Sequence, residues 1–398
     1  MENNPDLFIE INERNYIFTV GAFDQEQKFR IQEKIITLNE GIYKNKFIDM
    51  NQAYEVIKKN IEKIEKKIKY IFKDVTIILD NFNYTCINIS GFKRLNGSQV
   101  LKENISYILN SLKLAVTESE KHKTILHIFN SKSILDGVKS ENLPIGLFGD
   151  FYSHELSFFL INNNDLNNIK KIFNKNNLNI KKIILKQFSD GTQLINKNDD
   201  IRNFFTVKIG NNFSHINYFE DHSYRYSQSF NFGTDIIYND VNKICSLDND
   251  MIIKFFSNNN LDEKSFTDND YLENNYFMKG NFRKIKKKLL IDIVDARINE
   301  IVNLIFNSNI NIRSHKKKLS KIYLTINDPL IEKNFIGKFK NYFIQNGNLE
   351  INFMDEFDPE DTVVNVANLS TYGWKKEAIP IVQTKNSLIT RIFKSLFE

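Results

Sequence analysis

Residues 51–82, NQAYEVIKKNIEKIEKKIKYIFKDVTIILDNF, hold the pattern that decides the fold class. Apolar residues recur at helical spacing with lysines between them, which predicts an amphipathic helix from about Asn51 to Phe72. The run that follows, KDVTIILDNF, is short and largely apolar, as is typical of a strand in a sheet covered on both faces. A long helix that returns into such a strand indicates an α/β fold.

The segments on either side of this stretch extend the same alternation. Three β-type runs precede the helix: LFIEIN, YIFTVGAF and KFRIQEKIITL. After it, residues 84–161 form a unit of their own, with a helix near 100–116 and strand patterns at 124–137 and 153–161. A further helix and strand, LNNIKKIFNKNN and IKKIILKQF, look like a return to the first unit. We therefore interpret residues 84–161 as an insertion.

Strand patterns begin again at about residue 201, which indicates a duplicated architecture. They are FFTVKIG, HINYFED and SYRYSQSFNF. An amphipathic helix at 284–307 leads through the basic segment RSHKKK to the strand KIYLTIN. A final helix near 363–374 precedes a linker.

Composition excludes several classes of function. The 398 residues carry 54 Lys and Arg against 49 Asp and Glu, and a net charge of +5 is too small to favour nucleic acid as a partner. Cys86 and Cys245 are far apart, and no pair of histidines has metal-site spacing, so we predict neither a metal site nor catalytic residues. No signal peptide or apolar run of transmembrane length is present, so we expect a cytosolic protein.

The C-terminal stretch NSLITRIFKSLFE, residues 386–398, predicts an amphipathic helix. Its apolar stripe consists of Leu388, Ile389, Ile392, Phe393, Leu396 and Phe397. Lys385, Arg391 and Lys394 add positive charge that would favour anionic lipid. The pattern alone fits a membrane-seeking helix and a helix packed on its own domain equally well.

Several stretches resemble a known family in the same order along the chain. ILHIFNSKSILDGVKSENLPIGLFG, followed by LKQFSDGTQLI, resembles the bacterial cell-division protein FtsA, a family of the actin superfamily. GIYKNKFIDMNQAYEVIKKNIEKIE looks like that family's turn and first long helix, and NFGTDIIYNDV like the segment after its second phosphate loop. LLIDIVDARINEIVNLI is similar to the helix before its adenosine strand. The similarity runs from about residue 7 to the end.

The resemblance implies a duplicated, actin-like α/β fold with an inserted subdomain and a C-terminal amphipathic helix. The implied parts are subdomain 1A at 1–83, the inserted 1C at 84–161, 1A again at 162–200, 2A and 2B at 201–345, a return to 1A at 346–376, a linker at 377–385 and a membrane-targeting helix at 386–398.

The implied nucleotide site departs from the family pattern. EINERNY stands where the family has DIGTSK, VKIGNNFSH where it has DIGGGTTD, and LTINDP where it has LTGGG. Glycines let backbone N–H groups approach phosphates, and the lost carboxylate would help to place Mg²⁺, so we expect weak binding of ATP with Mg²⁺, or none, and no useful hydrolysis. The positions that match the site are Asn12, Lys208, Gly210, Asn211, Asn212, Gly233 and Asn327.

The resemblance also implies partners. In the FtsA family subdomain 2B binds the C-terminal peptide of the tubulin-like FtsZ. The matching positions are Arg283 and Arg297, on or beside the helix that carries Lys284 and Lys287, and all four are predicted FtsZ-binding residues. The implied protein is a non-enzymatic adaptor that forms filaments on the inner face of the cell membrane at the division septum. It would bind FtsZ, itself, anionic lipids and other division proteins.

Three alternatives remain open from the sequence. A pilus-assembly-type scaffold would share the α/β core and lack the lipid-seeking tail. An ATP-dependent enzyme of the same superfamily would need intact phosphate loops. In a plain oligomerisation module the terminal helix would pack on another subunit and bind no lipid.

Overall fold

The computed structural model describes residues 4–43, 46–80, 82–198, 200–258, 261, 266–267, 269–277, 283–317, 321–344 and 349–380. The chain divides into two compact units. Unit 1 comprises residues 1–202, 219–227 and 357–398, and unit 2 comprises 203–218 and 228–356. The predicted terminal helix lies outside the described residues.

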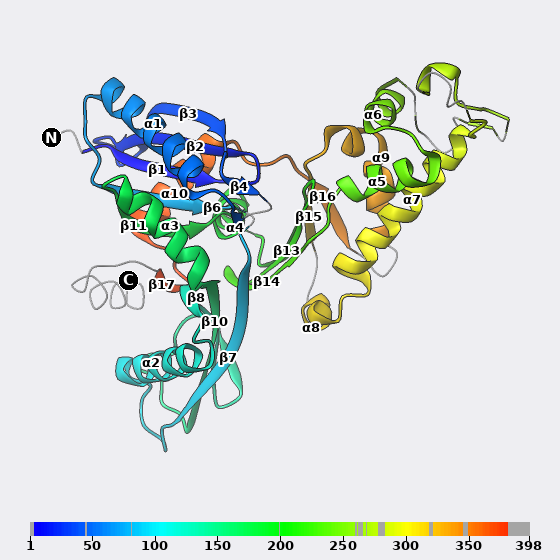
Figure 1. Ribbon diagram of the computed structural model, residues 1–398. Coiled ribbons are helices and arrows are strands. Elements are labelled where there is room, and N and C mark those ends of the chain that lie inside the picture. Colours follow the sequence, from blue (N-terminus) through cyan, green and yellow to red (C-terminus); the bar gives the residue numbers. More distant parts are fainter. Residues whose placement is uncertain are drawn as a thin grey trace. The chain divides into compact units, whose positions relative to one another are not determined.

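A five-stranded sheet forms the centre of unit 1, in the order β11-β6-β1-β2-β3 (Figure 1). Strands β1 (Asp6–Ile11), β6 (Asp74–Leu79) and β11 (Asn179–Leu185) are parallel, whereas β2 (Asn15–Phe23) and β3 (Phe29–Leu38) continue it antiparallel. Residues 75–79 are all buried, which confirms the predicted strand. A small pair, β4 (Ile42–Tyr43) and β5 (Lys46–Phe47), follows β3.

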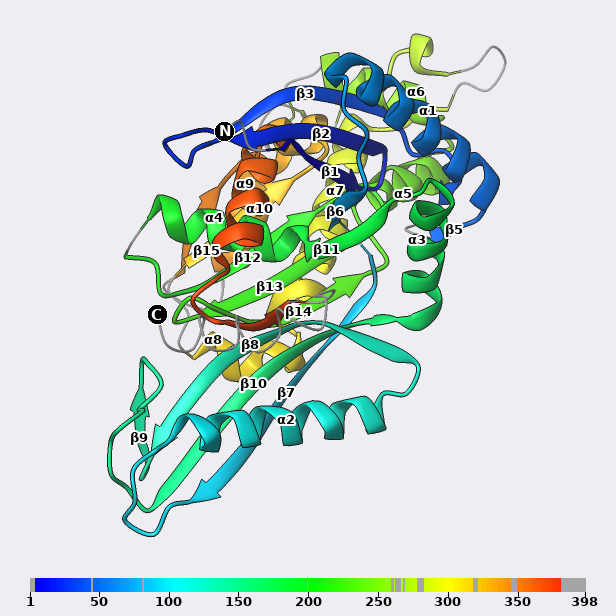
Figure 2. The ribbon, with the colours of Figure 1, turned by 90° about the vertical axis from the view of Figure 1, so that its left-hand side faces the viewer.

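Two pairs of helices cover the faces of this sheet (Figure 2). Helix α1 (Met50–Ile68) packs with α3 (Asn163–Lys175), and α4 (Lys186–Lys197) packs with α10 (Pro359–Tyr372). The Asp49 side chain caps α1 by accepting from two backbone N–H groups, and the helix ends where Lys69 takes a φ of 58°. The predicted helix was therefore longer than α1, which stops before Tyr70.

The predicted insertion region carries a second sheet, in the order β17-β8-β10-β7. Its strands are β7 (Tyr84–Arg94), β8 (Lys123–Leu135), β10 (Phe151–Asn162) and β17 (Glu377–Pro380), and the short β9 (Val138–Ser140) pairs with β8. Helix α2 (Lys102–Ser119) lies along one face (Figure 2) and buries Ile105, Ile108, Leu109, Leu112 and Val116 against it.

Strand β17 covers part of the predicted linker, so residues 377–380 are ordered against β8. Its Glu377 is buried and lies 2.6 Å from Nδ1 of the buried His127, whose Nε2 accepts from the backbone N–H of Leu185. Because Nε2 accepts a hydrogen bond, the ring proton is on Nδ1, and Nδ1–H donates to Glu377. Strand β17 is thereby tied to both sheets of unit 1.

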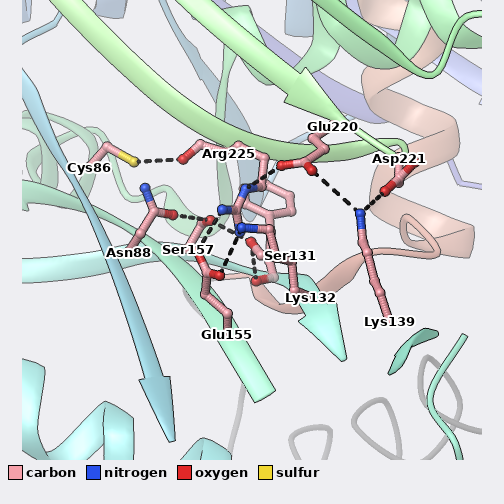
Figure 3. Close-up of polar contacts among 11 residues, drawn as sticks. Cys86, Asn88, Ser131, Lys132, Lys139, Glu155, Ser157, Glu220, Asp221 and Arg225 are labelled. Atoms are coloured by element: carbon pink, nitrogen blue, oxygen red, sulfur yellow. Dashed lines mark hydrogen bonds and ion pairs between the residues drawn. The ribbon is translucent and has the colours of Figure 1, made fainter. Parts of the chain in front are cut away.

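The tip of the hairpin formed by β13 (Ser214–Glu220) and β14 (Ser223–Phe230) belongs to unit 1. Arg225, 2% exposed, lies 2.5 Å from Glu155 of β10 and 3.4 Å from Glu220 (Figure 3). Lys132 pairs with Glu155, and Lys139 pairs with Glu220. Because each buried charge has a partner, the tip is held by ion pairs rather than by apolar packing alone.

Unit 2 repeats the sheet pattern of unit 1. Its five-stranded sheet has the order β14-β13-β12-β15-β16. In both units the first three strands along the chain are neighbours in the sheet, and two later strands extend the sheet beside the first of them. Strands β12 (Asn203–Ile209), β15 (Lys321–Ile326) and β16 (Glu350–Phe353) are parallel. The repeated order is the duplication that the sequence pattern indicated. We assigned residues 346–376 to the return to the first unit, whereas unit 2 extends to Glu356.

The described helices of unit 2 pack against one another beside this sheet. Helix α7 contacts α5 and α9, and helix α6 also contacts α5 and α9. Their bounds are α5 (Asp235–Cys245), α6 (Asn249–Asn258), η1 (Asn274–Tyr276), α7 (Lys287–Val302), the π-helical turn η2 (Asn303–Asn307), η3 (Ile310–Ile312), α8 (Arg313–Lys316) and α9 (Pro329–Ile344). Among the described residues no helix is long and apolar enough to cross a membrane.

Candidate functional site

The β1–β2 turn stands where the resemblance places the first phosphate loop. The Asn12 side chain accepts from the backbone N–H groups of Arg14 and Asn15, and its amide donates to Glu10. Asn39 donates to the backbone carbonyls of Asn12 and Glu13. Asn12, a predicted nucleotide-binding residue, therefore stabilises its own turn.

Four polar residues meet at the carboxyl ends of β1, β6 and β11. Lys186 Nζ lies 2.8 Å from Glu10 Oε1, and Gln187 Nε2 donates to Asp80 Oδ1 at 3.0 Å. All four side chains are almost fully buried. Glu10 Oε2 and Gln187 Oε1 are buried without a hydrogen-bond partner. We call Glu10, Asp80, Lys186 and Gln187 the strand-end cluster.

The loop after β12 contains three of the predicted nucleotide-binding positions of unit 2, Gly210, Asn211 and Asn212, and a fourth, Gly233, lies just before α5. Its carbonyls at Gly210 and Asn211 accept from the backbone N–H groups of Thr234 and Asp235, at the start of α5. A Cβ on Gly233 would lie 2.1 Å from the Gly210 carbonyl oxygen, so only glycine fits there. These helix-start N–H groups, which would favour an anion, already bind the loop.

Two further predicted positions of unit 2 converge on one carboxylate. Glu356 accepts from Asn327 Nδ2 at 3.0 Å and pairs with Lys208 Nζ at 2.5 Å. The Lys208 side chain, 15% exposed, therefore has an acidic partner within its own unit. A phosphate at Lys208 would have to compete with Glu356 for the same ammonium group.

These local contacts do not fit ATP with Mg²⁺, which the actin-like fold implies. Of the two cluster carboxylates that could help to place the metal, Glu10 is paired with an ammonium group and Asp80 accepts from Gln187. The helix-start N–H groups are paired with loop carbonyls. Within the described residues no group of three acidic, His or Cys side chains could hold a metal ion. We therefore derive no chemical step through a nucleotide.

The predicted partner cations lie on or just before α7. Arg283 and Lys284 are exposed; Arg283 donates to Ser246 Oγ, and Lys284 lies 4.5 Å from the Tyr271 ring. By contrast, Lys287 pairs with Glu273, and Arg297 pairs with Asp240 and Glu300. At 1.5 Å per residue, Arg297 lies roughly 15 Å along the helix from Lys287. The predicted surface thus has two exposed cations at one end of α7 and an internally paired arginine at the other.

The predicted membrane-binding residues are not part of the described structure. Lys385, Leu388, Ile389, Arg391, Ile392, Phe393, Lys394, Leu396 and Phe397 all lie outside the described residues.

The chain is similar in sequence to the cell division protein FtsA of Buchnera aphidicola subsp. Acyrthosiphon pisum, with 22% identity over 315 residues that cover 78% of this chain and 74% of the relative. The protein of the same name from Buchnera aphidicola subsp. Schizaphis graminum is 23% identical over 318 residues, covering 79% and 74%. The chain thus resembles proteins named cell division protein FtsA over more than three quarters of its length. No family model matches it.

A solved structure gives independent support for the fold. The PilM-PilN type IV pilus biogenesis complex contains a chain that superposes with a TM-score of 0.56 at 9% identity, covering 92% of this chain and 98% of that one. At this identity the likeness concerns the fold alone. It agrees with the predicted actin-like α/β architecture.

Sequence reasoning missed the strand-end cluster. Glu10 was noted only as part of a degenerate loop, and Lys186, Gln187 and Asp80 were read as residues of strands. Two signals were available: Lys186 and Asp80 each directly follow a buried apolar strand, and parallel strands bring such positions to one edge. The sequence around Glu356 contains no comparable pattern that would predict its contact with Lys208.

Proposed function

We propose that this chain is an actin-like cell-division adaptor that assembles on the inner face of the cytoplasmic membrane and links FtsZ filaments to it. The observation that carries the proposal is the similarity to two proteins named cell division protein FtsA over more than three quarters of the chain. The actin-like fold supports self-assembly into filaments. The site residues support a binding protein rather than an enzyme, because the loops that would hold ATP are internally paired.

The terminal segment supplies the proposed membrane anchor. Fully burying its six large apolar side chains would contribute on the order of 10 kcal/mol, of which shallow insertion realises a part. Ordering a short helix opposes this gain, so one copy binds weakly and reversibly. A filament presents many copies at once, and the combined binding becomes firm.

Co-sedimentation with anionic liposomes tests the anchor. We expect the full chain to pellet, whereas a truncation after Thr384 and Phe393→Glu remain soluble. Ser395→Gln, on the polar side of the same predicted helix, is the matched control and should pellet like the parent. If all four proteins stay in the supernatant at concentrations that permit assembly, the membrane proposal is wrong and a pilus-type scaffold or oligomer takes its place.

The exposed cations before α7 supply the proposed FtsZ site. Arg283→Glu should weaken binding of an acidic FtsZ C-terminal peptide about tenfold in fluorescence anisotropy, since one charged contact is worth roughly 1.4 kcal/mol or more. Arg297→Glu would also place a third carboxylate beside Asp240 and Glu300, so its thermal unfolding must be measured in parallel.

Lys338→Glu is a control on the neighbouring helix α9, where the lysine pairs with Asp295. Peptide affinity should be unchanged in this variant. Equal affinities for the parent, Arg283→Glu and a folded Arg297→Glu would remove this surface as the partner site.

A further inference from the structure

The strand-end cluster lies where α/β proteins usually bind ligands. In open α/β sheets, the carboxyl ends of parallel strands form the edge at which ligand-binding groups gather. Glu10 is the penultimate residue of β1, Asp80 directly follows β6, and Lys186 is the first residue of α4, directly after β11. The register places Ile11 beside Leu79, and the Asp80 N–H donates to the Ile11 carbonyl at 3.0 Å. The two carboxylates therefore belong to adjacent strand ends.

The burial of these groups requires a positive charge. Glu10 is 1% exposed and Asp80 3% exposed, and buried carboxylates are strongly disfavoured without a cationic partner. Lys186, itself 4% exposed, brings an ammonium group to 2.8 Å from Glu10. Lys186 therefore balances the charge of Glu10 from within the chain.

The remaining oxygens show what else the cluster could hold. Glu10 Oε2 and Gln187 Oε1 are buried and have no hydrogen-bond partner. Carboxylate and amide oxygens are the ligands that Mg²⁺ and Ca²⁺ prefer. An oxygen-lined group of this kind would attract a divalent cation if the lysine charge were removed.

We propose that Lys186 is a built-in cation, which supplies at the strand ends the positive charge that a bound divalent metal would otherwise supply. The chain then holds this edge of unit 1 in its folded arrangement without metal or nucleotide. This inference does not depend on the membrane or FtsZ proposals, because it concerns charge balance within unit 1.

The test compares thermal unfolding of the full-length protein in EDTA with unfolding in millimolar MgCl₂ at matched ionic strength. The parent midpoint should be the same in both buffers and in Mg²⁺ with ATP. Lys186→Ala leaves Glu10 without its cationic partner, so in EDTA the midpoint of this variant should drop by on the order of 10 °C. Mg²⁺ should restore a large part of that drop.

A charge-free pair is the matched control. The double variant Glu10→Gln/Lys186→Met removes both charges while keeping similar volume, so it should unfold near the parent midpoint and show no response to Mg²⁺. Binding of Mn²⁺, followed by electron paramagnetic resonance, should appear in Lys186→Ala and be absent from the double variant.

Two results would overturn the proposal. One is a parent protein whose midpoint rises with Mg²⁺ or with Mg²⁺ and ATP. The other is a Lys186→Ala protein equally destabilised in both buffers, which makes the lysine an ordinary structural ion pair. If Lys186→Ala is insoluble, refolding yield replaces the midpoint: recovery only with Mg²⁺ supports the proposal, and failure in both buffers contradicts it.

Discussion

His154 of β10 shows how burial sets the behaviour of a single residue. It is 1% exposed, and neither ring nitrogen has a hydrogen-bond partner. Burial, together with the nearby Lys376 charge, lowers its pKa to about 4, while Glu155 acts weakly in the opposite direction. The neutral ring is therefore the form that the fold accepts.

The depressed pKa predicts a pH dependence of stability. Above the unfolded pKa of about 6.5 the ring is neutral in both states, and the full stability is present. As the pH falls from about 6.5 to about 4, His154 binds a proton in the unfolded chain but not in the folded chain. This difference lowers the unfolding free energy by about 3 kcal/mol. Urea unfolding between pH 7 and pH 4 measures this loss.

A histidine variant isolates the contribution of this residue. His154→Leu should flatten the pH dependence of the unfolding free energy by most of that amount. His122→Leu, at an exposed position, should keep the slope of the parent. If both variants keep the pH dependence of the parent, burial of His154 does not control the loss of stability at low pH.

At the scale of elements, two helical glycines differ in the space around them. Gly191 lies in α4, where an added Cβ would be 1.9 Å from the Phe219 ring; Gly337 lies in α9, where nothing is within 4 Å. Alanine has the higher helix propensity at both positions. The space around the added Cβ therefore decides whether alanine raises or lowers the unfolding free energy at each position.

Alanine substitution should therefore have opposite effects in these two helices. Gly337→Ala should raise the unfolding free energy by roughly 0.5–1 kcal/mol. Gly191→Ala should lower it by roughly 1–3 kcal/mol, because Phe219 must move within a packed core. Urea titration of the two variants side by side provides the measurement, and a stabilised Gly191→Ala would show that Phe219 can shift freely.

At the scale of the whole molecule, strand β17 is the last element of the described fold. Truncation after Thr384 should leave the unfolding free energy of the folded units unchanged. Truncation after Lys375 removes Glu377 and Ala378, leaves the Nδ1–H of His127 without its acceptor, and should cost roughly 2–4 kcal/mol. Equal stability of the two truncations would mean that β17 does not hold unit 1 together.

The sequence by itself determined the α/β class and indicated a duplicated architecture, because apolar periodicity follows local geometry. The same periodicity fails where tertiary contacts decide. The strand IKKIILKQF was predicted to reach Phe188, whereas helix α4 begins at Lys186. The buried side of α4 carries Ser189 and Thr192, whose polar groups accept from Asn365 of α10. A polar residue can face a core only when a distant partner satisfies it.

The candidate site also combines features that the sequence shows with contacts that only the tertiary structure shows. The sequence identified the altered loops, because missing glycines can be read directly from the chain. Only the tertiary structure brought Lys186 to Glu10 and Glu356 to Lys208, pairs separated by more than a hundred residues. Charge pairing depends on distances that the folded sheets set, so a sequence pattern records the charges but not their partners.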